Sequence, residues 1–309
     1  MCLTCGCGDN AEPTLTNLET GETIAISPEN SKDYHNLPDS TVITHGQGEN
    51  LLIQNHSHTA SHTHTLPDGT VITHSHDRES HPTHNGESSQ IHAKIHGTTI
   101  TLEQDILAKN NLIAAENRGW FKGRNIRSLN LVSSPGAGKT TLLTRTINDL
   151  KDDLPIYVIE GDQATANDAR KIQATGCKVV QINTGTGCHL EAAMVERGLQ
   201  ELNPPLNSVV MIENVGNLVC PALFDLGESA KVVILSVTEG DDKPIKYPHM
   251  FRASDIMILN KIDLLPYVEF DVERCLEYAR KVNPQIRIFQ VSATTGVGLQ
   301  NWYDWLKNQ

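Results

Sequence analysis

The spacing of hydrophobic residues changes near position 98 of this 309-residue chain. Beyond it, short β-branched runs alternate with stretches whose apolar residues recur at helical spacing, and several runs are apolar on both faces. Strands buried on both faces are typical of a parallel sheet covered by helices on each side. We therefore predict a doubly wound α/β domain over residues 98–309, preceded by a helix with Thr101 and Gln104 as its capping box. Strands are expected near 128–133, 155–160, 178–182, 208–213, 231–237, 255–259 and 286–291.

The part of the chain before this domain has a different composition. Twelve of the fourteen histidines precede residue 97, and residues 9–97 are rich in Ser, Thr, Asn, Asp, Gly and Pro. Such a segment buries too little apolar surface to offset the entropy of ordering it, so we predict that it is mostly disordered. It contains an imperfect duplication, at 37–45 and 66–74, for which a short hairpin at the Asp-Gly turn and a low-complexity expansion are the alternatives.

Charge and cysteine content narrow the classes of function. The formal charge of −12 argues against broad attraction to nucleic acid or to an anionic membrane. No apolar stretch approaches the roughly 20 residues of a membrane helix, and the N-terminus lacks a secretion signal, so we expect a cytoplasmic protein. Three of the seven cysteines lie within the first seven residues. In a reducing compartment this pattern favours metal binding over disulfides.

The clearest chemical motif is a phosphate-binding loop, Ser-Ser-Pro-Gly-Ala-Gly-Lys-Thr-Thr, at residues 133–141. It lies between a predicted strand and a predicted helix, the context that a P-loop requires. Free backbone N–H groups and the helix dipole make such a helix start suitable for phosphate oxygens. Ser133 replaces the first glycine of the motif, so the turn must depend on Gly136 and Gly138. The residues expected to bind the nucleotide here are Ser134, Pro135, Gly136, Ala137, Gly138, Lys139, Thr140 and Thr141.

Side chains around the loop are candidates for catalysis. Lys139 is expected to neutralise the β and γ phosphates, and the Thr140 hydroxyl to ligate Mg²⁺. Asp162 and Glu213 follow predicted strands and are candidates for holding Mg²⁺ and a catalytic water, although either carboxylate could instead cap the next helix. Gly216 is a candidate for sensing the γ-phosphate through its N–H.

A second motif indicates which base is bound. Asn260, Lys261 and Asp263 form an Asn-Lys-x-Asp sequence directly after a predicted strand, where ligands of open parallel sheets bind. The Asp263 carboxylate can accept two hydrogen bonds from guanine, whereas adenine lacks that donor edge. Asn260 would support the base and the loop, and the stem of Lys261 would lie against the ring. Ser292 and Ala293 follow the last strand, where a backbone N–H could meet the guanine carbonyl, so the expected ligand is GTP or GDP.

Two groups of residues near the N-terminus indicate metal binding. Cys2, Cys5 and Cys7 can converge on one ion because glycines lie between and after them, and three thiolates suit Zn²⁺, Cu⁺ or Ni²⁺, with a square-planar site favouring nickel. An exposed redox-active terminus is the alternative. Four histidine pairs suit a weak multi-ion reservoir, or a tolerated low-complexity tract: His56/His58, His62/His64, His74/His76 and His81/His84.

A third candidate metal site lies within the α/β domain. Cys188, His189 and Cys220 all follow predicted strands, and Cys220 comes four residues after Gly216. A metal held there would respond to the nucleotide state. Three ligands per chain could form half of a site shared across a dimer, or a site completed by water. We interpret Cys177 and Cys275 as packing residues.

Taken together, these motifs resemble those of the HypB family, the GTPases that support nickel insertion during maturation of nickel-iron hydrogenases. The resemblance covers about 99–309 and the N-terminal cysteines. The matching stretches are Ser133–Thr141, Thr186–Leu190, Glu213–Pro221, Thr238–Pro244 and Asn260–Asp263.

The resemblance implies a slow GTPase that forms a homodimer when GTP is bound. It also implies a metal site near the dimer interface built from Cys188, His189 and Cys220, a tight nickel site in the Cys-x-x-Cys-Gly-Cys motif of residues 1–8, and a histidine tract for storage. A HypA-type accessory protein that binds Zn²⁺ is the implied partner, and the implied recipient of nickel is the hydrogenase large subunit. The competing hypotheses are a urease-type nickel-maturation GTPase, a nickel storage protein and an ATP-dependent enzyme.

Overall fold

The computed structural model describes residues 13–26, 62–65, 71–74, 88–163 and 165–308, and side chains within 13–26, 104–163 and 165–308. The chain divides into two compact units, Met1–Ser31 with His96–Gln309, and Lys32–Ile95. Cys2, Cys5 and Cys7 lie outside the described residues, as does most of the histidine-rich segment.

The larger unit is built on a nine-stranded sheet in the order β11-β10-β9-β5-β8-β6-β7-β1-β2. The seven strands from β5 to β11 pair in parallel, and each lies within two residues of its predicted position. The prediction of a doubly wound α/β domain is therefore confirmed. Their bounds are β5 Arg127–Ser133, β6 Ile156–Asp162, β7 Lys178–Asn183, β8 Val209–Glu213, β9 Ala230–Ser236, β10 Ile256–Asn260 and β11 Arg287–Gln290.

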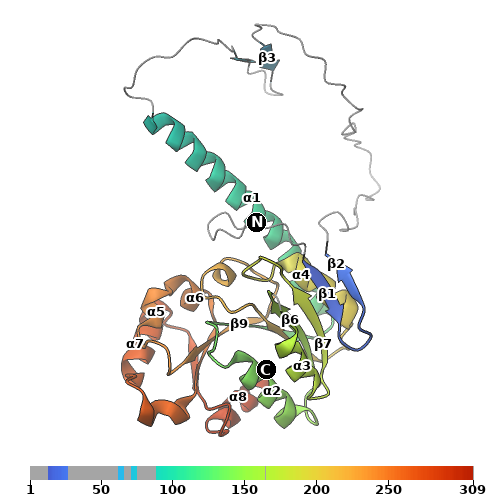
Figure 1. The fold of residues 1–309 in the computed structure, drawn as a ribbon, viewed down its shortest axis with the longest axis vertical. Helices are drawn as coiled ribbons and strands as arrows, with labels where there is room; N and C mark the ends of the chain where they lie inside the picture. The colour runs from blue at the N-terminus through green and yellow to red at the C-terminus, as the bar shows by residue number, and fades with distance from the viewer. Residues whose placement is uncertain (1–12, 27–61, 66–70, 75–87, 164, 309) are drawn as a thin grey trace. The chain divides into compact units, whose positions relative to one another are not determined.

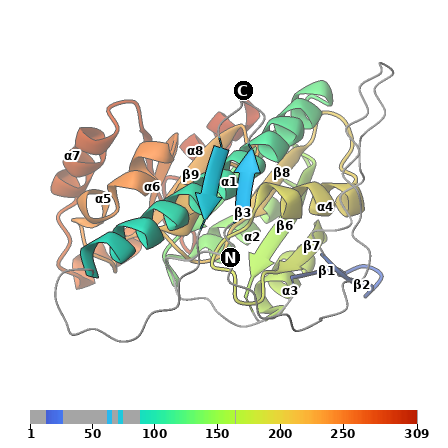
Figure 2. The ribbon, with the colours of Figure 1, turned by 90° about the horizontal axis from the view of Figure 1, so that it is seen from above.

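Two further strands come from a stretch that the sequence assigned to the disordered segment. β1 (Thr14–Asn17) pairs antiparallel with β7, and β2 (Thr23–Ala25) pairs antiparallel with β1. Figure 2 shows them at the edge of the sheet beyond β7. Leu15 is 1% exposed and belongs to the core, so its burial and the free edge of β7 together order this hairpin. The prediction of disorder was wrong for these residues.

Helices cover both faces of the sheet, as Figure 1 shows. One core cluster lies under α2 (Lys139–Leu150), α3 (Asn167–Gln173) and α8 (Leu299–Lys307). The opposite face carries two core clusters, with side chains from α1 (Ser88–Gly123), α4 (Ala192–Leu202), α6 (Pro248–Ala253) and α7 (Val272–Val282). Three short elements complete the domain: η2 (Cys220–Ala222), α5 (Lys243–Lys246) and η3 (Ile262–Tyr267).

Helix α1 begins earlier than the sequence predicted. It spans 36 residues and runs through Thr101, so Thr101 lies inside a helix and is not its N-cap. Its C-terminal part is anchored by Phe121 in the core and by Asn117, whose amide donates to the carbonyls of Ala192 and Leu226 at 2.9 and 3.1 Å. None of the helices in the described ranges combines the length and apolar character needed to cross a bilayer.

In the smaller unit, β3 (His62–Thr65) pairs antiparallel with β4 (Val71–His74). Within the second copy of the duplicated segment, Val71–His74 therefore form a paired strand, whereas the first copy, 37–45, lies outside the described residues. Of the four histidine pairs, His62/His64 belongs to β3, and the remaining three lie wholly or partly outside the described residues.

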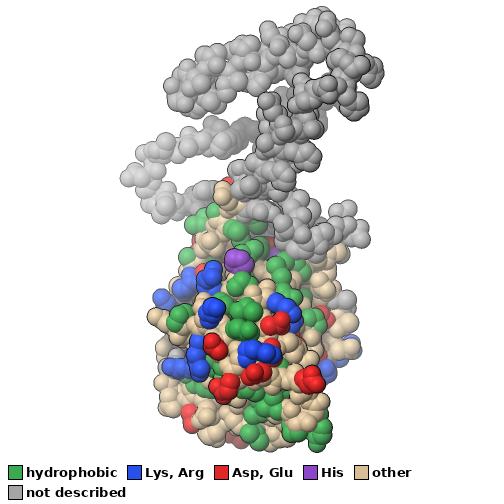
Figure 3. Space-filling view, turned by 90° about the vertical axis from the view of Figure 1, so that its left-hand side faces the viewer, with side chains coloured by type: hydrophobic (Ala, Val, Ile, Leu, Met, Phe, Trp, Pro, Cys, Tyr) green, Lys and Arg blue, Asp and Glu red, His purple; other side chains and the backbone are tan. Residues whose placement is uncertain are grey.

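The face of the larger unit that carries α5 and α7 intermixes basic and acidic side chains (Figure 3). Two ion pairs illustrate the pattern: Arg274 with Asp241, and Lys246 with Asp242 at 2.7 Å. Because the two signs alternate, this face presents no basic field of the kind that attracts nucleic acid.

Candidate functional site

The phosphate-binding loop joins β5 to α2 through two glycines in the left-handed region. Gly136 has φ 78° and Gly138 has φ 91°. A Cβ on Gly138 would lie 2.6 Å from the Asn260 side-chain nitrogen, so this glycine is also required by close packing. Ser133 is buried at the end of β5 and is not among the residues with positive φ, which explains why a serine is tolerated there.

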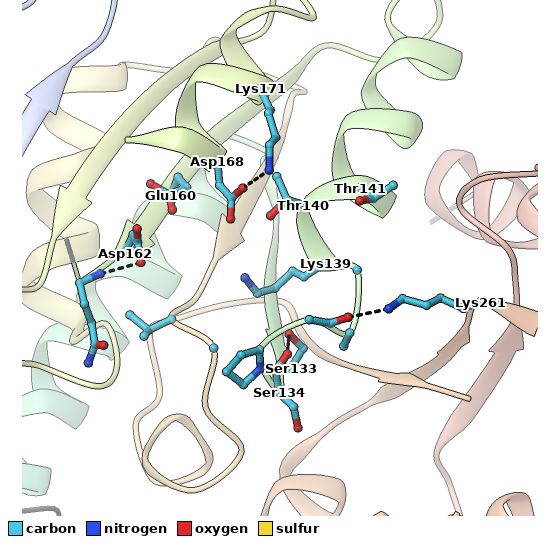
Figure 4. A pocket seen from close by; sticks show the side chains of 18 residues that line it. Ser133, Ser134, Lys139, Thr140, Thr141, Glu160, Asp162, Asp168, Lys171 and Lys261 are labelled. Carbon is cyan, nitrogen blue, oxygen red and sulfur yellow. Dashed lines mark hydrogen bonds and ion pairs between the residues drawn. The ribbon is translucent and has the colours of Figure 1, made fainter. Parts of the chain in front are cut away.

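This loop lines a cavity of about 470 Å³, a size within the range of small-ligand sites. The remaining walls come from the end of β6, the start of α3, the segment after β8 and Lys261. Figure 4 shows Lys139 and Thr140 directed into the same space as Glu160 and Asp168. Phosphate-binding backbone and a group of carboxylates therefore face one cavity.

Glu213 connects the basic and hydroxyl groups of the loop. Its Oε1 accepts hydrogen bonds from Lys139 Nζ at 2.8 Å and from Thr140 Oγ1 at 2.6 Å. The Oε2 atoms of both Glu213 and neighbouring Glu160 are buried without a hydrogen-bond partner among the described residues. Burial, followed by the charges of Glu213 and Asp162, raises the pKa of Glu160 to about 9. Unpartnered carboxylate oxygens beside a threonine hydroxyl fit the oxygen ligands that Mg²⁺ prefers.

Asp162 bonds to the loop that follows it and does not cap the next helix, since the N-cap of α3 is Ala166 and carries no side-chain cap hydrogen bond. Its Oδ1 accepts from the Gln163 N–H at 2.8 Å, and its Oδ2 accepts from the Thr165 N–H at 3.0 Å and hydroxyl at 2.7 Å. It still lines the cavity. In this conformation Asp162 shapes the loop between β6 and α3.

Three charged residues at the cavity were missed by the sequence analysis. Asp168, in the first turn of α3, pairs with Lys171 at 2.7 Å, and both line the cavity. Burial alone would raise the pKa of Asp168, but its hydrogen bond and ion pair with Lys171 hold the pKa below its usual value. Lys243 Nζ lies 3.4 Å from Ser134 Oγ. Asp168 follows soon after Asp162, the last residue of β6, and this spacing could have indicated it. Lys243 is distant in sequence from the loop.

The Asn-Lys-x-Asp segment is tied to the phosphate loop. Asn260 donates to the Ala137 carbonyl at 3.0 Å and accepts from the Ala293 N–H at 3.2 Å. Lys261, with φ 62°, donates to the Gly136 carbonyl at 2.7 Å. Asp263 Oδ1 is buried without a hydrogen-bond partner among the described residues. A buried acceptor of this kind is suited to a ligand that brings its own N–H groups.

The N–H groups of Ser292 and Ala293 bond within the protein in this conformation. The Ser292 N–H donates to the Val297 carbonyl at 2.9 Å, and the Ala293 N–H donates to Asn260. Both donors are used to fold the loop after β11. Ala293 therefore helps to position Asn260 in this conformation, and the contact of either N–H with a base stays a prediction.

The structure brings Cys188, His189 and Cys220 together. Their ligand atoms all lie within 4.8 Å of one another, and all three side chains are buried. Cys188 Sγ is 3.7 Å from His189 Nδ1. His189 packs on the Phe224 ring with centroids 3.9 Å apart, and burial lowers the pKa of His189 to about 4. A neutral imidazole and two thiol groups form a donor set that suits Ni²⁺ or Zn²⁺.

One of the three metal candidates, Cys220, lies on the segment that leaves the nucleotide cavity after β8, whereas Cys188 and His189 follow β7. A Cβ on Gly216 would lie 3.2 to 3.3 Å from Pro135, so Gly216 rests against the phosphate loop. The Asn217 amide donates to the Cys188 carbonyl at 3.4 Å, and its oxygen accepts from the Val219 N–H at 2.7 Å. The two sites thus share one stretch of backbone.

Comparison with known proteins agrees with this geometry. Residues 128–290 match the family model "CobW/HypB/UreG, nucleotide-binding domain". Over 210 residues the chain is 58% identical to the hydrogenase maturation factor HypB of Escherichia coli (strain K12), covering 68% of this chain and 72% of that protein. It is 38% identical over 224 residues to the hydrogenase/urease maturation factor HypB of Helicobacter pylori (strain J99), covering 71% of this chain and 92% of that protein.

Two solved structures are similar to the larger unit. A crystal structure of HypB from Archaeoglobus fulgidus gives a TM-score of 0.61 at 37% identity, covering 65% of this chain and 98% of that one. A crystal structure of HypB from Helicobacter pylori in complex with nickel gives 0.60 at 39% identity, covering 64% and 93%. The chain therefore belongs to the HypB family of hydrogenase maturation factors, within the CobW/HypB/UreG group of P-loop nucleotide-binding proteins.

Proposed function

We propose that this protein is a GTP-hydrolysing nickel metallochaperone that delivers nickel to the large subunit of nickel-iron hydrogenase. The observation that carries the proposal is the buried trio of Cys188, His189 and Cys220, because Cys220 lies on the segment that leaves the nucleotide cavity and Cys188 is hydrogen-bonded to that segment. A nucleotide-dependent change in that segment alters the geometry of the metal ligands. Hydrolysis of GTP then changes nickel affinity and releases the ion to the acceptor.

The residues of the cavity divide the work on GTP. The loop N–H groups and Lys139 hold the phosphates, and the unpartnered Asp263 oxygen accepts the donors of guanine. Thr140 and Glu213 would hold Mg²⁺, which when bound neutralises charge that develops on the phosphates. The buried carboxyl of Glu160 lies beside Glu213, where it helps to position water. No arginine is among the described residues that line the cavity, and the lack of this charge on the transferring phosphate supports a slow hydrolysis rate.

Nickel is the cargo in this proposal. Two cysteines and a neutral histidine per chain leave a coordination position for a ligand from a second copy or for water. Val219 and Leu223 flank Cys220 and are 57% and 56% exposed, which supports a homodimer contact at this face in the GTP-bound state. Cys2, Cys5 and Cys7 supply a separate tight nickel site, and a HypA-type zinc protein is the accessory partner. Delivery takes place in the cytoplasm.

Labelled nickel offers a direct test. The full chain is loaded with ⁶³Ni²⁺ and GTP, mixed with unmatured hydrogenase large subunit, and the label on the large subunit is counted. Lys139→Ala, Cys188→Ala and a Cys2/Cys5/Cys7 triple alanine variant are compared with Cys177→Ala, which removes a thiol outside the metal trio. Transfer should fall in the first three and persist in the control. Full transfer by both Lys139→Ala and Cys188→Ala contradicts the proposal.

Urease is a second acceptor to include. The Helicobacter relatives carry the name hydrogenase/urease maturation factor, which favours testing both apo-enzymes side by side. Transfer to apo-urease alone would reassign the acceptor and leave the nucleotide chemistry unchanged.

A further inference from the structure

A chain of buried polar side chains runs beneath the metal trio. It begins at Asn214, directly after β8 and two residues before Gly216. The Asn214 oxygen accepts from the Leu190 N–H at 3.1 Å, and its amide donates to Asn130 on β5 at 3.2 Å. Leu190 follows His189 in the sequence, so one end of this chain fixes the backbone beside a metal ligand.

The other end of the chain holds the turn that contains Cys220. The Asn130 amide donates to Glu228 Oε1 at 3.0 Å, and that oxygen lies 3.6 Å from Lys231 Nζ on β9. Lys231 Nζ donates to the carbonyls of Pro221 at 2.8 Å and Phe224 at 3.2 Å. Pro221 follows Cys220, and the Phe224 ring packs on His189.

This network is costly to bury and is well paired. Asn130 and Asn214 are 0% and 1% exposed, and the side chains of Glu228 and Lys231 are each 7% exposed. Glu228 Oε2 accepts a further bond from the Leu226 N–H at 2.7 Å. A buried ion pair of this kind is weak evidence for stability, because apolar residues of equal volume often stabilise a core as well. Its value lies in fixing one arrangement of the segments that it joins.

We propose that Asn214, Asn130, Glu228 and Lys231 form a relay that positions the metal ligands according to the nucleotide. The inference rests on the proposed function and identifies the side chains that connect the nucleotide site to the metal site. A displacement of Gly216 moves Asn214, which carries the Leu190 N–H and the adjoining His189 with it. Lys231 holds the Cys220 turn against β9. The distance between His189 and Cys220 therefore changes with the nucleotide, and these four side chains act as positioning residues.

The test compares nickel affinity in two nucleotide states. The full chain with Cys2, Cys5 and Cys7 replaced by alanine is titrated with Ni²⁺ in GDP and in a non-hydrolysable GTP analogue. Binding is followed by thiolate-to-nickel charge-transfer absorbance, which histidines do not produce. Asn130→Leu removes an inner member of the relay and Lys231→Met removes one end, each at similar volume. Asn283→Leu is the control, because Asn283 also donates to two carbonyls, those of Phe251 and Ser254, outside the relay.

The readout is the ratio of the two nickel dissociation constants. Coupling between two sites in one protein typically gives a ratio of roughly 5 to 150. We expect such a ratio in the parent and the control, and a ratio within about twofold of one in both relay variants. A purely structural role would weaken nickel binding equally in both states and leave the ratio intact, which would overturn the relay while the proposed function stands. A parent ratio of one would overturn the nucleotide coupling itself and the relay with it. If Asn130→Leu fails to fold, Lys231→Met decides by the same ratio.

Discussion

Replacing Asp263 by asparagine gives the sharpest test of the base that this protein binds. Asp263 lies in the first turn of η3, and its buried Oδ1 has no hydrogen-bond partner among the described residues. Guanine brings two donors, N1–H and the 2-amino group, to such a carboxylate. The introduced amide keeps the shape but replaces one acceptor oxygen with a donor and removes the charge.

The size of the effect follows from the two lost bonds. A hydrogen bond to a charged group contributes about 1.5 to 3 kcal/mol, so two contribute about 3 to 6 kcal/mol. Because each 1.4 kcal/mol is tenfold in affinity, GDP binding should weaken by at least about 100-fold. Xanthine has a carbonyl where guanine has its 2-amino group, so the introduced amide can donate to it. We therefore expect the variant to prefer xanthosine diphosphate over GDP.

Fluorescent nucleotide titration measures both dissociation constants. Glu269→Gln, which neutralises an exposed carboxylate six residues further on, is the matched control and should keep wild-type GDP affinity. Asp263→Asn with unchanged GDP affinity, or with equal loss for both bases, would refute the assignment of Asp263 to the base.

Three further predictions concern the loop and its surroundings. Glu160→Gln should flatten the pH dependence of the unfolding free energy. Because the pKa of Glu160 is raised to about 9, the wild type should lose stability as pH rises from about 4.5 through 9, with a slope of up to about 1.4 kcal/mol per pH unit. Urea unfolding without nucleotide or Mg²⁺ measures this slope. A wild-type unfolding free energy that does not change over this pH range would contradict the raised pKa of Glu160. Gly216→Ala should weaken binding of a GTP analogue more than GDP in calorimetry, because its Cβ would press on the backbone of Pro135; equal losses would exclude Gly216 as a γ-phosphate sensor. Ser133→Gly should leave GDP affinity unchanged but lower the unfolding free energy by about 0.5 to 1 kcal/mol, since Ser133 has no positive φ; tighter GDP binding would show that the serine strains the loop.

Most of the sheet could be predicted because each parallel strand is a local run of apolar residues. β8 is buried at all five positions, and β9 at all seven, so their sequences alone show that both faces are covered. β1 and β2 gave no such signal. Only Leu15 of β1 is fully buried, and the strand forms by pairing with β7, about 165 residues later in the chain. Pairing between strands so far apart in the chain has little effect on the local spacing of hydrophobic residues, so that spacing does not predict it.

The residues of the site also divide into those that the sequence could identify and those that it could not. Lys139, Thr140 and Asp263 belong to contiguous motifs, and the sequence identified them. The N–H groups of Ser292 and Ala293 fold the turn after β11, which the spacing of a strand end does not reveal, and their contact with a base stays a prediction. The place of Asp168 and Lys171 at the cavity depends on how α3 packs beside the phosphate loop. The relay from Asn214 to Lys231 becomes visible only when β5, β8 and β9 are placed side by side.

The short connection between β8 and η2 makes independent sites difficult to arrange. Cys220 lies seven residues after Glu213, and Gly216 lies between them against Pro135. Asn217 binds the Cys188 carbonyl, and Asn214 binds the Leu190 N–H, so both halves of the metal trio are bonded to this connection. A γ-phosphate that moves Gly216 must stretch or relax those bonds. By linkage, nickel must then change GTP affinity by the same factor that GTP changes nickel affinity, whichever of the two binds first.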